Sequence, residues 1–123
     1  MNSWFLLAAL CSAAVCLTHI ILGGRAAAVP LLAADGLNKV AKYTNYYCWH
    51  IVTIVLAGQA LAFALVAQAP DERLLAMFTT GSAIAFFVWN LAMIAIFKLR
   101  LMHFPQWLLF IPSSGLGLMG LYL

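Results

Sequence analysis

Four long uncharged stretches alternate with short charged segments along this chain. Each stretch holds more than the roughly 20 residues that an α-helix needs to cross about 30 Å of hydrocarbon. Lipid requires every backbone polar group to be bonded within the protein, and the period-two alternation typical of membrane barrel strands is absent. The pattern therefore predicts four transmembrane helices. The uncharged stretches are residues 1–24, 43–70, 74–97 and 101–123, and the helices are expected at about 2–24, 46–69, 74–97 and 104–122.

The connections predict how these helices are arranged. The links at 70–73 and 98–100 are short, so successive helices are expected to be antiparallel neighbours. The predicted fold is an all-α, integral membrane up-down four-helix bundle, with residues 1–123 forming a single transmembrane domain. Gly23 and Gly24 are expected to end the first helix. The loop 25–45 either lies on the membrane surface or begins the second helix in its later part, with Asp35 as the N-cap.

Composition supports a membrane protein. Of the 123 residues, 67% are apolar and 7% are charged, whereas a soluble protein has about 25% charged residues. Nine charges are too few to coat the surface of a soluble domain of this size. The composition therefore excludes a soluble enzyme, a nucleic-acid-binding protein and a disordered chain, and it makes the lipid bilayer the first partner.

The basic residues predict the orientation of the chain in the membrane. Five of the six Lys and Arg residues fall in the first and third connections, and one falls in the second. Because cytoplasmic loops carry an excess of Lys and Arg, the loop 25–45 is expected in the cytoplasm and both termini on the periplasmic side of an inner membrane. The five are Arg25, Lys39, Lys42, Lys98 and Arg100, and the sixth is Arg73.

Two histidines are expected at matching depths. His19 lies seven residues past the centre of the first predicted helix, and His50 lies seven residues before the centre of the second. Both are then roughly 10 Å from the membrane midplane on the cytoplasmic side. Asn90 falls in the same half of the third helix. Because polar side chains inside a bilayer usually face the interior of the protein, His19, His50 and Asn90 are candidate cofactor-binding residues.

Three chemistries are open for these residues. Two histidines on adjacent helices could supply both axial ligands of a haem b, with a quinone nearby. Cys16 and His19, three residues apart, could instead join His50 in a copper or zinc site. In the third interpretation the side chains bond to one another or to backbone and hold the helices together. All three carboxylates, Asp35, Asp71 and Glu72, lie in connections, so no catalytic residues and no proton-coupled exporter are indicated.

One sequence pattern resembles a known family. It consists of His19-x3-Gly23-Gly24-Arg25, then Pro30-Leu31-Leu32, then Trp49-His50-x2-Thr53. It is similar to a stretch found in small four-helix bacterial inner-membrane proteins that have no assigned activity. The resemblance implies bacterial origin and a membrane location.

The sequence therefore favours a non-enzymatic inner-membrane protein, an accessory or assembly component with a polar His/Asn cluster in the cytoplasmic half. Its expected partner is another membrane protein or a second copy of the chain. The alternative is a redox protein that binds haem b or a metal through His19 and His50.

Overall fold

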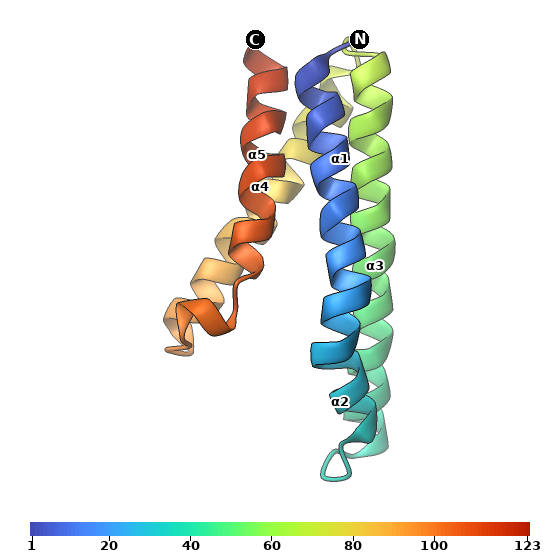
Figure 1. The fold of residues 1–123 in the computed structure, drawn as a ribbon, viewed down its shortest axis with the longest axis vertical. Helices are drawn as coiled ribbons and strands as arrows, with labels where there is room; N and C mark the ends of the chain where they lie inside the picture. Colours follow the sequence, from blue (N-terminus) through green and yellow to red (C-terminus); the bar gives the residue numbers. More distant parts are fainter.

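The computed structural model describes residues 1–123, which form helices joined by short connections, with no strand. The chain runs up and down through the molecule, and both termini lie at one end, called here the terminal end (Figure 1). The opposite half carries five of the six basic residues and is called the basic end. The elements are α1 (Ser3–Thr18), the π-helix η1 (His19–Ala28), α2 (Val29–Ala33), α3 (Lys39–Gln68), α4 (Arg73–Ile96), the 3-10 turn η2 (Leu101–His103) and α5 (Gln106–Tyr122).

The first helix is longer than the sequence predicts. α1, η1 and α2 form one continuous helix over Ser3–Ala33, so the expected end at Gly23 and Gly24 is wrong. A glycine ends a helix by adopting a positive φ, and no glycine here does so. The backbone instead widens, and the Val29 N–H donates to the Gly24 carbonyl in the π pattern. The α pattern resumes around Pro30, which has no N–H to donate.

Of the two alternatives for residues 25–45, the structure has the one in which the later part begins the second helix, and only residues 34–38 lie outside the helices. α3 begins at Lys39, and its N-cap is Asn38, not Asp35: the Asn38 Oδ1 accepts from the Ala41 N–H at 2.8 Å. At 1.5 Å per residue, the 30 residues of α3 span about 45 Å, which exceeds the hydrocarbon thickness by about 15 Å. The first two helices therefore form a hairpin whose tip extends beyond the other helices at the basic end (Figure 1).

Three of the four helices, not all four, are long and apolar enough to cross a membrane. They are the helix Ser3–Ala33, α3 and α4. α5 has 17 residues and so spans about 25 Å, with Pro112 inside it. Large apolar side chains cover the outer surface, among them Ile54 and Leu74, which is typical of a surface that faces lipid. The structure therefore supports a helical membrane protein in general.

Backbone and side-chain contacts fix the antiparallel register of α1 and α3. At the terminal end, the Asn2 N–H donates to the Ala67 carbonyl at 2.8 Å. Further along, the Cys16 thiol donates to the Thr53 carbonyl at 3.8 Å. These two contacts bracket most of α1, so the two helices stay side by side along the length of α1.

Asn2 joins three helices at the terminal end. Its Oδ1 accepts from the backbone N–H groups of Trp4 and Phe5, which caps α1. Its Nδ2 donates to the Gly120 carbonyl on α5 at 3.1 Å. The backbone N–H of Asn2 also bonds to Ala67 on α3. Asn2 therefore connects the start of α1 to the ends of α3 and α5.

The hydrophobic core is concentrated near the terminal end. Phe5 is 1% exposed and stacks on Phe63, with ring centroids 6.3 Å apart. A Cβ added to Gly120 would lie 2.6 Å from the Phe5 ring, so α5 approaches α1 closely only because this position lacks a side chain. This cluster consists of Phe5, Ala8, Ala9, Phe63, Val66, Ala67 and Ala76, and a smaller one consists of Val15, Cys16 and Leu56.

The four helices do not form an evenly packed bundle. α1 packs mainly against α3, and α4 mainly against α5, whereas contact between α3 and α4 is slight. Figure 1 shows α4 and α5 leaning away from the α1–α3 pair toward the basic end. The molecule is therefore closed at the terminal end and open at the basic end.

The contact at Gly120 yields a stability prediction. Gly120→Ala is expected to lower the free energy of unfolding by about 1–3 kcal/mol, because the new methyl group overlaps the Phe5 ring. Gly115→Ala is the matched control on the same helix, since a Cβ there would meet nothing within 4 Å. It should be neutral or stabilise by up to about 1 kcal/mol. Chemical unfolding in detergent micelles measures both, and equal effects would contradict the packing described.

Candidate functional site

His19 contacts α3 in two ways: its ring stacks on a side chain of α3, and it forms one hydrogen bond to the backbone of α3. The imidazole stacks on the Trp49 indole with centroids 4.5 Å apart and planes inclined by 22°. Its Nε2 lies 3.2 Å from the Trp49 carbonyl oxygen. Because a carbonyl oxygen can only accept a hydrogen bond, Nε2 carries the proton and its N–H is the donor. The first predicted site residue is therefore already bonded to the backbone of the neighbouring helix.

His50 follows Trp49 on α3, but its side chain is exposed. Its ring meets those of Trp49 and Tyr46 edge-on, at centroid distances of 5.1 and 4.6 Å. The α1–α3 register makes His19 and His50 level, as their spacing predicts. Each imidazole contacts the Trp49 ring, and the two do not stack on one another.

Cys16, the third predicted metal ligand, donates its thiol to the Thr53 carbonyl. The Thr53 hydroxyl in turn donates to the Trp49 carbonyl at 3.2 Å, so that carbonyl accepts two bonds. No group of three or more His, Cys, Asp or Glu side chains is placed to hold a metal ion. Cys16, His19 and His50 are therefore not assembled as a ligand set.

These residues do not fit a bis-histidine haem site either. The His19 nitrogen that faces α3 is engaged by the Trp49 carbonyl, and His50 lies at the surface. Five cavities of the molecule are lined by no histidine. The arrangement that the structure contains is the third one expected from the sequence, in which polar side chains bond to backbone and join α1 to α3.

Asn90 is not part of this histidine cluster. Its Oδ1 accepts from the Trp107 backbone N–H at 3.1 Å, so a side chain of α4 caps the start of α5. Asn90 also lines a cavity that no histidine borders. The three predicted cofactor-binding residues thus fall into two separate places.

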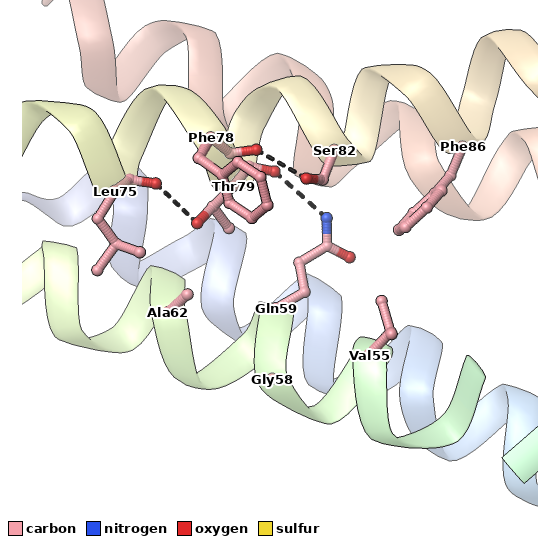
Figure 2. A pocket seen from close by; sticks show the side chains of 9 residues that line it. All are labelled: Val55, Gly58, Gln59, Ala62, Leu75, Phe78, Thr79, Ser82 and Phe86. Atoms are coloured by element: carbon pink, nitrogen blue, oxygen red, sulfur yellow. Dashed lines mark hydrogen bonds between the residues drawn. The ribbon is translucent and has the colours of Figure 1, made fainter. Parts of the chain in front are cut away.

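The cavities that border α3 and α4 form one continuous groove. The first, nearer the terminal end, has a volume of about 240 Å³ and is drawn in Figure 2. The second, called here the wedge, has about 410 Å³ and extends toward the basic end. The two share Val55 and Phe86, where they meet. The first cavity is lined by Val55, Gly58, Gln59, Ala62, Leu75, Phe78, Thr79, Ser82 and Phe86.

Gln59 is the polar residue of this groove that the sequence interpretation missed. Its side chain is 7% exposed, and its Nε2 donates to the Thr79 carbonyl at 3.4 Å. The Gln59 Oε1 has no hydrogen-bond partner and points into the space between Val55 and Phe86 (Figure 2). The available signal was a lone amide near the middle of an uncharged stretch of 28 residues.

The neighbouring hydroxyls do not satisfy this amide oxygen. Thr79 donates its hydroxyl to the Leu75 carbonyl, and Ser82 donates its hydroxyl to the Phe78 carbonyl, both at 2.8 Å. Both bonds lie within α4, as Figure 2 shows. The groove therefore contains one free acceptor on otherwise largely apolar walls.

No protein-family model, curated protein or solved structure matches this chain.

The two histidines should differ in their effect on stability. His19→Ala is expected to lower the free energy of unfolding by about 1–2 kcal/mol, since it removes a hydrogen bond and a ring stack. His50→Ala should change it by about 0.5 kcal/mol or less, because that side chain is exposed. Chemical unfolding in micelles provides the comparison. Equal losses, together with a visible absorption band that either substitution removes, would instead indicate a shared haem.

Proposed function

We propose that this protein is a non-enzymatic accessory or assembly component of a bacterial inner membrane, and that it binds a transmembrane helix of another polypeptide in the part of the α3–α4 groove around Gln59. The excess of basic residues at one end favours a cytoplasmic basic end and periplasmic termini. The sequence resemblance supports the bacterial origin. The geometry of His19 and His50 gives no support to the redox alternative.

The free oxygen of Gln59 carries this proposal. Inside hydrocarbon there is no water to bond an amide oxygen, so an amide oxygen that faces the groove without a donor is costly. A hydroxyl or amide N–H from another helix would supply the missing donor. Polar bonds of this kind between membrane helices contribute about 0.6–2 kcal/mol.

The walls of the groove suit a helix as the occupant. Gly58 and Ala62 on α3 and Ser82 on α4 are small residues of the kind that let membrane helices approach closely. A Cβ placed on Gly58 would meet nothing within 4 Å, so the space beside it is open. Gly58 therefore leaves room at the wall of the groove for atoms of a partner helix.

The depth of Gln59 agrees with this interpretation. It lies nine residues before the end of α3 at Gln68, which is about 14 Å along the helix. With the terminal end at one membrane surface, this places the amide near the middle of roughly 30 Å of hydrocarbon. A polar residue at that depth is more easily satisfied by another helix than by a lipid headgroup.

Photo-crosslinking tests the proposal. Phe78 lines the groove, whereas Ile54 on α3 does not, and both are 72% exposed. A benzophenone amino acid at position 78 should give a protein adduct of discrete mass in native membranes, and the same group at position 54 should not. An adduct with twice the mass of this chain would identify a second copy as the partner. An adduct of any other mass would identify a different membrane protein.

The adduct must also depend on the amide. Gln59→Leu is expected to reduce the position-78 adduct at least several-fold. Gln68→Leu is the matched control, because Gln68 is exposed and donates only to Ala64 within its own helix. The proposal is wrong if positions 54 and 78 give the same adducts, or if Gln59→Leu leaves the adduct unchanged.

A further inference from the structure

The wedge has a different character from the part of the groove around Gln59. Seven of its nine lining residues are apolar, and its two amides, Asn90 and Gln106, come from α4 and from the start of α5. Its lining comes from α3 on one side and from α4 and α5 on the other, and Figure 1 shows α4 and α5 leaning away from α3 toward the basic end. The lining residues are Val52, Val55, Leu56, Phe86, Trp89, Asn90, Met93, Gln106 and Phe110.

The segment that joins α4 to α5 folds beside the wedge. This segment follows α4, which contributes Met93 to the lining of the wedge. It ends at the start of α5, where Gln106 also lines the wedge. Two hydrogen bonds hold it in a turn: the His103 N–H donates to the Arg100 carbonyl at 2.9 Å, and the Trp107 indole donates to the Leu101 carbonyl at 3.4 Å. Both ends of the segment are therefore anchored at the wedge.

The end of α4 places a lysine where a glycine is normally found. The Leu99 N–H donates to the Ile94 carbonyl at 3.0 Å, and the Lys98 N–H donates to the Ala95 carbonyl at 3.4 Å. This is the Schellman pattern, whose turning residue adopts a positive φ and is usually glycine. Lys98 has a φ of 50° and is the one non-glycine residue of the chain with a positive φ. A strained lysine at this position points to a role for its side chain.

Lys98 and Arg100 give the segment between α4 and α5 a positive charge. Both side chains are exposed, and the connecting segment contains no acidic residue. The three acidic residues of the chain lie elsewhere, at the hairpin tip (Asp35) and in the α3–α4 turn (Asp71 and Glu72). An apolar cavity whose walls are joined by a basic segment is complementary to an acyl chain that carries an anionic headgroup.

We infer that the wedge binds one anionic phospholipid, with an acyl chain between α3 and the α4–α5 pair and the headgroup phosphate beside Lys98 and Arg100. Basic side chains near a membrane surface attract anionic lipids, and the apolar walls exclude a free phosphate from the cavity itself. The wedge lies on the basic side of Val55 and Phe86, whereas the partner helix would contact Gln59 on the other side. The two proposed occupants therefore contact different parts of the groove, which meet at Val55 and Phe86.

Native mass spectrometry of the full chain tests the headgroup. The protein is exchanged in micelles with dioleoyl phosphatidylglycerol or with dioleoyl phosphatidylcholine, and retained lipid is counted. We expect one phosphatidylglycerol to be retained about tenfold more than phosphatidylcholine. The double substitution Lys98→Gly and Arg100→Gln should abolish this preference. Because glycine suits the positive φ, the variant should remain folded.

Arg73→Gln is the matched control for charge, because Arg73 starts α4 at the terminal end. It removes one basic residue and should leave the preference unchanged. Equal retention of the two lipids by the unmodified protein would overturn the inference, and so would a preference that survives the double substitution.

A second pair of variants tests the acyl chain. Val52→Trp fills the wedge and should reduce retention of either lipid at least fivefold, whereas Ile51→Trp, next to it on α3 but outside the wedge lining, should not. Retention unaffected by Val52→Trp would overturn the placement of the chain. The crosslink from position 78 reports the partner helix separately, so its failure leaves the lipid result intact.

Discussion

The packing of Phe5 against Gly120 and Phe63 is the contact on which the shape of the molecule depends. It lets α5 lie close to α1 at the terminal end, where Asn2 also joins α1 to α3 and α5. Contact between α3 and α4 is slight by comparison, and the wedge lies between α3 and the α4–α5 pair. One closed end and one open end follow from where small and large residues meet, because close helix packing requires a missing side chain at the point of approach.

The histidines illustrate why polar residues inside a membrane protein are ambiguous. A buried imidazole must be hydrogen-bonded, and a backbone carbonyl on a neighbouring helix satisfies it as well as a metal would. His19 has such a carbonyl from Trp49, and the same carbonyl accepts from Thr53. The cluster therefore serves to join α1 and α3. The groove differs because its Gln59 oxygen has no partner within the chain, and this unmet bond is what makes it a candidate for recognition.

Two positions depart from what local structure prefers, one in the groove and one at the end of α4. Gln59 holds a polar amide in an apolar setting, and Lys98 holds a positive φ that suits glycine. Each departure lowers the free energy of unfolding, and the packing at the closed terminal end offsets that loss. The proposed helix partner and the proposed lipid are the two occupants that would make use of these residues, one at mid-depth and one at the membrane surface.

The sequence by itself determined the class of protein and the number of helices, because uncharged runs of more than 20 residues can be stable only as helices in lipid. Spacing also placed His19 and His50 at one level. It could not decide the end of the first helix, because glycines end a helix only when they adopt a positive φ, and Gly23 and Gly24 do not. It could not decide which way a polar side chain faces, since that depends on the neighbouring helix. Tertiary structure alone therefore separated Asn90 from the histidines, left the Gln59 Oε1 without a partner and opened the wedge.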